Sequence, residues 1–291
     1  MLKHQGDTNM PSFFKTEKEN TSKTRLIDNL KIYSEKTGRN VVIYASNFLN
    51  DDSEENYINS FDKNGFMKVM NNLNKSKGLD LILHTPGGAI SETESIIDYL
   101  HVQFNQNIRA IIPQMAMSGG TMIACSCNEI YMGNQSSLGP VDPQILDMSA
   151  KSVIKEHELA KKEIMEQPET IPYWTTLLDK YPANFVFECE NLIEWSENIL
   201  EKALKYSKTK NINKLKKFLI TNESIKEHSQ NFSAIQCKEM GLPIKFLENE
   251  KNLNKLILSI HKEYLNYFNE NNARKIFVNQ KGIFISVYSD K

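Results

Sequence analysis

The sequence predicts an α/β protein built around a parallel β-sheet. Between residues 40 and 133, apolar runs of strand length alternate with stretches of roughly 10 to 15 residues that have helical spacing. Two turns in this region carry a glycine pair, Gly87-Gly88 and Gly119-Gly120, each between an apolar run and a helix-like run. Strand–helix–strand units join parallel neighbours by right-handed crossovers, so the loops that follow the strands gather at one edge of the sheet. We therefore expect both glycine pairs at that edge.

The expected elements follow one another without an internal repeat. A first helix is expected at residues 25–38, where apolar residues recur at helical spacing and Gly38 provides a stop signal. The strands are expected at residues 40–46, 79–86, 108–113 and 129–133. The helices between them are expected at residues 53–73, with a break near Gly65, and at residues 90–104 and 119–127. Beyond residue 150 the pattern predicts helices at residues 151–167, 185–206, 214–230 and 253–268, and then a hairpin at residues 275–288 around Gly282.

These elements form three parts, and the composition limits what they do. We expect a flexible leader at residues 1–24, a main domain at residues 25–248, and a C-terminal helix and hairpin extension at residues 249–291. Lys and Arg number 35 against 36 Asp and Glu, so there is no basic surface to attract nucleic acid. No apolar run approaches the roughly 18 residues of a transmembrane segment, and the first 25 residues lack the apolar centre of a signal peptide. We expect a cytoplasmic protein.

The cysteines give no sign of a metal site. Cys125, Cys127, Cys189 and Cys237 lack paired C-x-x-C spacing and the density of a disulfide scaffold, so they are expected to be free thiols. No G-x-x-x-x-G-K-[ST] motif for nucleotide phosphates occurs in the sequence. We expect neither a metal nor another cofactor.

The glycine pairs and Ser118 are the candidate chemical centre. Glycine at a strand-to-helix turn adopts positive φ and exposes unpaired backbone amides, which can bind an oxyanion. A serine at the head of the following helix, exposed beside such amides, meets the requirements of an acyl-transfer nucleophile. Two simpler interpretations stay open: the glycines only permit tight turns, and Ser118 only caps the helix.

Three segments extend this interpretation by resemblance. The segments "HTPGG", "MAMSGGTMIA" and "SSLGPVDPQ", in this order and spacing, resemble the serine dehydrogenase proteinase family, a branch of the Clp/crotonase superfamily related to ClpP and SppA peptidases. The resemblance runs from about Leu26 to Leu247. It implies a Clp/crotonase-like ββα superhelix with a helical C-terminal extension, a homo-oligomer, and a peptide or unfolded protein as substrate.

The resemblance also implies roles for individual residues. Ser118 is the implied nucleophile, and the amides of Gly88 and Gly119, in turns that include Gly87, form the implied oxyanion hole. The place where ClpP-like chains carry their histidine reads "LGPVD" and holds none. SppA-like peptidases instead use a lysine some forty to fifty residues beyond the serine.

Two candidates for the general base remain. The SppA-like window contains three lysines, Lys155, Lys161 and Lys162, of which Lys161 is preferred because it borders the apolar stripe of its helix. His228 occupies the place of the third triad member of ClpP-like chains and is the alternative base or an orienting residue.

His84 is expected to brace the "HTPGG" turn.

The hypothesis that results from the resemblance and from Ser118 is a serine peptidase. The alternatives are a catalytically inactive crotonase-fold scaffold or regulatory protein and, by the shared oxyanion design alone, an acyl-CoA enzyme.

Overall fold

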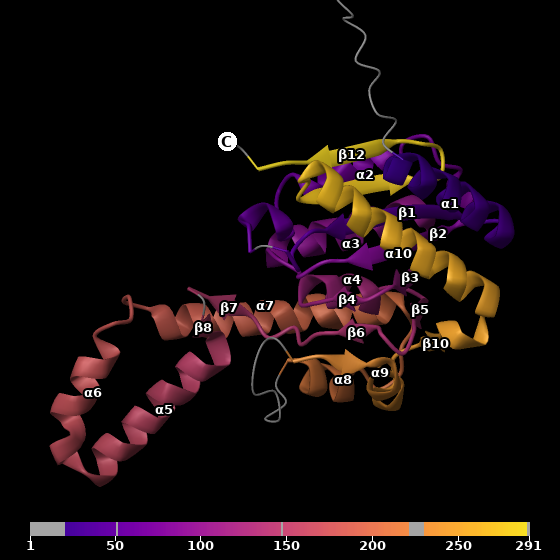
Figure 1. Cartoon of the computed structure of the whole chain (residues 1–291). Helices are drawn as coiled ribbons and strands as arrows, with labels where there is room; N and C mark the ends of the chain where they lie inside the picture. Colours follow the sequence, from indigo (N-terminus) through magenta and orange to yellow (C-terminus); the bar gives the residue numbers. More distant parts are fainter. Residues whose placement is uncertain (1–20, 51, 147, 221–229, 290–291) are drawn as a thin grey trace, which may run out of the picture.

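A mixed β-sheet forms the centre of the molecule, which the computed structural model describes over residues 21–50, 52–146, 148–220 and 230–289 (Figure 1). Within these residues the sheet has seven strands in the order β10-β5-β3-β2-β1-β11-β12. The parallel strands are β1 (Asn40–Ser46), β2 (Leu79–His84), β3 (Ile108–Ile112), β5 (Glu129–Met132) and β10 (Ile244–Phe246). The antiparallel strands are β11 (Lys275–Asn279), which pairs with β1, and β12 (Phe284–Val287). The predicted α/β class is confirmed.

Both faces of the parallel strands are buried, which explains their continuous apolar sequences. Along β1, Val42 and Tyr44 face one core cluster, whereas Val41 and Ile43 face the other. The helices α1 (Thr21–Thr37) and α10 (Lys251–Asn271) lie side by side over the second cluster (Figure 1). The first cluster is covered by α2 (Asp62–Met70), α3 (Ile90–Phe104), α4 (Gly119–Cys125), α7 (Phe185–Tyr206), α8 (Ile212–Leu219) and α9 (Ala234–Met240).

The segment expected as a C-terminal extension is part of the central fold. Its helix α10 packs against α1, and its hairpin adds β11 directly beside β1. The hairpin turns at Gly282, which has a φ of 84°. The last strands of the chain therefore complete the core of the sheet.

The helix α2 differs from its expected form, because it runs through Gly65 without a break. A Cβ atom on Gly65 would lie 2.6 Å from the ring of Phe277 on β11. This glycine is therefore required for close packing of α2 on the sheet.

A small second sheet lies beside the main one and was not expected from the sequence. It consists of β4 (Met115–Ala116), β6 (Ser137–Leu138) and β9 (Phe232–Ser233), with β4 parallel to β6. An isolated bridge from Thr85 to Ala116 links its first strand to the end of β2. The small sheet thus places the chain before α4 next to the turn that follows β2.

A helical arm projects from the body of the molecule (Figure 1). It consists of α5 (Ala150–Glu166), the 3-10 helix η3 (Pro168–Thr170) and α6 (Ile171–Leu178), the last of which was not expected. A small core of Ala150, Val153, Phe185 and Cys189 joins its base to α7. The remaining short elements are η1 (Glu54–Asn56), η2 (Lys75–Lys77), β7 (Gln144–Ile145), β8 (Met148–Ser149) and η4 (Leu247–Asn249). Within the described ranges, no helix has the length and apolar character needed to span a membrane.

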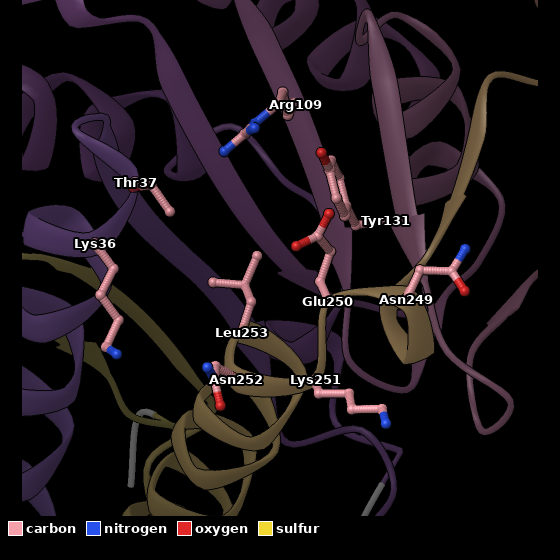
Figure 2. A pocket seen from close by; sticks show the side chains of 9 residues that line it. All are labelled: Lys36, Thr37, Arg109, Tyr131, Asn249, Glu250, Lys251, Asn252 and Leu253. Carbon is pink, nitrogen blue, oxygen red and sulfur yellow. The ribbon is translucent and has the colours of Figure 1, made fainter.

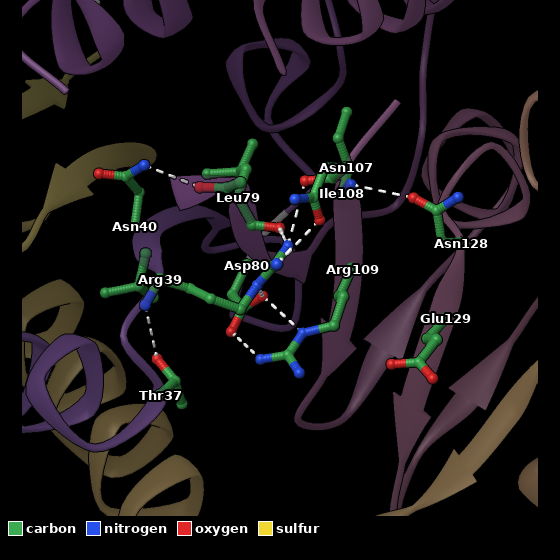
Figure 3. A network of polar contacts seen from close by, with 12 residues as sticks. Thr37, Arg39, Asn40, Leu79, Asp80, Asn107, Ile108, Arg109, Asn128 and Glu129 are labelled. Atoms are coloured by element: carbon green, nitrogen blue, oxygen red, sulfur yellow. Dashed lines mark hydrogen bonds and ion pairs between the residues drawn. The ribbon is translucent and has the colours of Figure 1, made fainter. Parts of the chain in front are cut away.

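A network of charged side chains around a buried carboxylate lies at the amino ends of the strands (Figure 3). The carboxylate of Asp80 is fully buried and accepts hydrogen bonds from Arg39 Nε at 2.6 Å, Arg109 Nε at 2.7 Å and the Tyr33 hydroxyl at 2.9 Å. A polar cavity of about 580 Å³ lies beside Arg109 and Tyr131 and is bounded by the first residues of α10 (Figure 2). This edge is opposite to the one that carries the glycine turns.

Candidate active site

The two glycine turns meet at the carboxyl edge of the sheet, as the order of elements predicts. The Thr85 N–H donates to the Met115 carbonyl at 3.2 Å, and the Met117 N–H donates to the Thr85 carbonyl at 2.9 Å. A Cβ atom on Gly87 would lie 2.7 Å from the Cβ of Ser118, so a side chain at this position would collide with the second turn. Glycine is required here by close approach as well as by its φ of 95°.

Ser118 has a strained backbone at the start of α4. Its φ of 47° and ψ of −113° are rare for a residue with a side chain, and strain of this kind is concentrated at functional sites. Ser118 occupies the N-cap position, but its side chain makes no capping hydrogen bond. Within the described part of the chain, its partly exposed hydroxyl has no hydrogen-bond partner. A capping role therefore does not account for this serine.

Two backbone amides beside Ser118 are free to bind an oxyanion. The Gly87 carbonyl accepts a hydrogen bond from the Ile58 N–H at 2.6 Å. Because the C=O and N–H of a trans peptide point in opposite directions, the Gly88 N–H points away from Ile58. Among the described residues, neither this amide nor that of Gly119 has an acceptor. Both glycines line the same cavity as Ser118.

This cavity has a volume of about 610 Å³ and an uncharged lining among the described residues. Its walls include Tyr57 beside the first turn, Val141 after the small sheet, and Leu192 and Trp195 on α7. The α7 residues were not expected in the site, because helical spacing shows that a face is apolar but does not show what that face contacts. Trp195 is held in place by its indole N–H, which donates to Glu94 at 3.3 Å.

Among the described residues, the candidate lysines are not brought to Ser118 within one chain. Lys161 is exposed on the projecting arm, as are Lys155 and Lys162, and none of the three lines the cavity. Lys161 follows Ala150, the first residue of α5, by eleven positions, which corresponds to about 16 Å along the helix axis. His228 lies outside the described residues.

His84 lies behind the first glycine turn as a buried neutral side chain. Its ring packs against Phe48 and Tyr264, at centroid distances of 4.9 and 5.6 Å. Burial lowers its pKa to about 3, with a smaller contribution from His261. This packing fixes the end of β2, where the "HTPGG" turn begins.

Two buried histidines and a partly buried one predict that the protein loses stability in mild acid. Burial lowers the pKa values of His84 to about 3 and of His101 and His261 to about 4. Below the ordinary histidine pKa of about 6.5, the unfolded chain binds protons that the folded chain excludes. The free energy of unfolding should therefore fall as pH drops from about 6.5 to 4, by up to about 1.4 kcal/mol per pH unit for each histidine.

Urea unfolding between pH 7 and pH 4.5 measures this slope. The variant His101→Phe keeps the stacking on Tyr206, whose ring lies 4.0 Å away, and removes one titrating group. Its slope should be shallower than that of the wild type. Equal slopes for the wild type and His101→Phe would show that His101 binds protons equally in the folded and unfolded states.

Alanine at Gly88 or Gly119 should damage activity more than folding. A Cβ atom on Gly88, where φ is 150°, would collide with the backbone of Ile58, and one on Gly119 would lie 2.5 Å from Thr93 Oγ1. Either collision would displace an amide, and the loss of one oxyanion donor lowers kcat by about 10² to 10³. An activity assay and thermal unfolding measure the two effects.

Gly241→Ala is the matched control, because Gly241 also has a positive φ of 108° but has no atom within 4 Å of the added Cβ. It should cost stability without affecting activity. If the loss of activity in Gly88→Ala equals its unfolded fraction, the glycines serve only to form the turns.

The described residues contain no cluster of three His, Cys, Asp or Glu side chains with a metal-binding arrangement.

Residues 55–246 match the family described as ClpP-like SDH-type serine proteinase. The chain is also similar to two uncharacterized proteins of Methanocaldococcus jannaschii. It is 28% identical to MJ0137 over 188 residues, which cover 65% of this chain and 60% of that protein. It is 35% identical to MJ1495 over 118 residues, which cover 35% of this chain and 39% of that protein.

Proposed function

Because the chain belongs to the family of ClpP-like SDH-type serine proteinases, we propose that it hydrolyses peptide bonds through an acyl-enzyme on Ser118. The observation that carries the proposal is the strained Ser118 turn, whose hydroxyl shares a cavity with the Gly88 and Gly119 amides. None of these three groups has a hydrogen-bond partner among the described residues. The relatives in Methanocaldococcus jannaschii are uncharacterized, so the proposal rests on the family and on the site.

In the proposed reaction, Ser118 Oγ attacks the carbonyl carbon of the scissile peptide while a general base takes its proton. The carbonyl oxygen becomes an oxyanion that the Gly88 and Gly119 amides stabilise. Collapse of this intermediate breaks the C–N bond, and the protonated base gives its proton to the leaving amine. Water then hydrolyses the serine ester by the same steps and regenerates the Ser118 hydroxyl. The uncharged cavity favours substrates with an apolar side chain at the cleaved bond.

We propose Lys161 as the general base, supplied by the arm of a second copy in a homo-oligomer. The exposed position of Lys161 on a projecting arm supports this arrangement, as do the large exposed side chains of Met165 and Tyr173 on the same arm. A lysine accepts a proton only in its neutral form, and desolvation favours that form. Docking against the uncharged cavity would provide the desolvation. His228 remains the alternative base.

A fluorophosphonate probe tests the proposal, because it forms a covalent bond to the hydroxyl oxygen of an activated serine. Wild-type protein should be labelled, and mass spectrometry of its peptides should place the label on Ser118. Heat-unfolded protein, in which the site is lost, provides the control. An unlabelled but folded and assembled sample would support the inactive scaffold instead.

A further inference from the structure

A buried ion pair lies behind the first glycine turn. Lys275 on β11 donates from Nζ to Asp62 Oδ1 at 2.6 Å, and each side chain is 1% exposed. Burial lowers the pKa of Lys275 from its ordinary value, and the adjacent carboxylate opposes that shift. A buried ion pair often adds little to stability compared with an apolar pair of the same size. Stability alone therefore does not explain why this ion pair lies beside the site.

The pair fixes the backbone of residues 57–59. Lys275 Nζ also donates to the Tyr57 carbonyl at 2.9 Å. The second oxygen of Asp62 accepts from the Tyr44 hydroxyl at 2.8 Å and from the Asn59 N–H at 3.1 Å. Both ends of this short segment are thus tied to buried charged groups.

Residues 57–59 in turn fix the glycine turn. The Ile58 N–H donates to the Gly87 carbonyl at 2.6 Å, and the Ala89 N–H donates to the Ile58 carbonyl at 2.9 Å. The Gly87 carbonyl and the Gly88 N–H belong to one planar peptide, so holding the carbonyl toward Ile58 holds the N–H toward the cavity. A flip of this peptide would remove one donor to the oxyanion.

We propose that Lys275 is a positioning residue, which keeps the Gly88 amide directed at the oxyanion by anchoring the Tyr57 carbonyl. The inference rests on the proposed peptidase function. It assigns a catalytic effect to β11, which lies beyond residues 55–246, the region that matches the family. Lys275 is not the general base, because its ammonium is bound to two acceptors and it does not line the cavity.

The test compares three variants. Lys275→Met removes the ammonium but leaves the Asp62 carboxylate buried without its cation, so it can fail to fold. Lys275→Met combined with Asp62→Asn removes both charges, while the Asn oxygen can still accept from Tyr44 and Asn59. Lys281→Met is the matched control, because Lys281 is an exposed lysine on the same hairpin.

The double variant should lower kcat for peptide cleavage about 10-fold or more and leave KM unchanged, since only stabilisation of the oxyanion is lost. A peptide aldehyde, which forms a hemiacetal oxyanion with the serine, should lose affinity by the same factor, whereas a product peptide should bind as before. If Lys275 had a purely structural role, the folded fraction of the double variant would keep the wild-type kcat, KM and affinity for the aldehyde. A folded double variant with wild-type kcat would overturn the proposal.

Hydrogen exchange separates this inference from the peptidase proposal. The amides of Ile58 and Ala89 should exchange faster in the double variant than in Lys281→Met, whether or not the protein cleaves peptides. Failure of wild-type labelling by the probe contradicts only the proposed function. Unchanged exchange at both amides contradicts the positioning role of Lys275.

Discussion

Replacing Ser118 with alanine should abolish labelling by a fluorophosphonate and lower peptide turnover by about 10⁴-fold or more. The hydroxyl is the only group of this residue that can form the acyl ester, and backbone amides alone retain a small residual catalysis. The strained turn should persist, because its φ of 47° is set by the contact between the two glycine turns rather than by the hydroxyl. Single-turnover labelling and steady-state cleavage of an apolar peptide measure the loss.

Ser91→Ala is the matched control, since Ser91 lines the same cavity as Ser118. It should retain labelling of Ser118, because its own hydroxyl is not the proposed nucleophile. Equal labelling of wild type and Ser118→Ala would show that the probe reacts elsewhere. Peptide cleavage that survives in Ser118→Ala would exclude the acyl-enzyme mechanism.

The central sheet was predictable from the sequence because its strands are buried on both faces. The strand at residues 40–46 and the helices at residues 90–104 and 185–206 have the predicted bounds. Long apolar runs and amphipathic helices carry local signals of this kind. The strands of the small sheet have two residues each, which is too short to show a period.

The parts of the site that were missed depend on contacts between distant segments. Gly65 looks like a helix breaker in the sequence, and only its contact with Phe277 shows why the helix continues. Lys275 is the first residue of β11, but its partner Asp62 lies 213 residues away. Likewise, the resemblance identifies a window of lysines, but spacing along a helix does not show what that helix contacts.

Lys161→Ala should reduce acylation of Ser118 by about 10² to 10⁴, the usual contribution of a positioned general base. Lys161→Arg should fail as well, because a guanidinium does not give up its proton near neutral pH. The neighbouring exposed lysine provides the control, and Lys162→Ala should keep its activity. If Lys161→Ala is fully active while His228→Ala is not, the base is His228, and activity should then fall as pH drops through about 6 to 7.

Mixing inactive subunits tests whether the arm acts between copies. A subunit with Ser118→Ala keeps Lys161, and one with Lys161→Ala keeps Ser118. Suppose that the oligomer is a dimer in which each arm reaches the site of the other subunit. About half of the mixed dimers are then heterodimers, and one of the two sites in each heterodimer has both Ser118 and Lys161. Activity should therefore return to about a quarter of the wild-type value. A pair formed within one chain could not be restored by mixing. Because Lys161 is exposed on the projecting arm and does not line the cavity of its own chain, we expect activity to return after the subunits are exchanged.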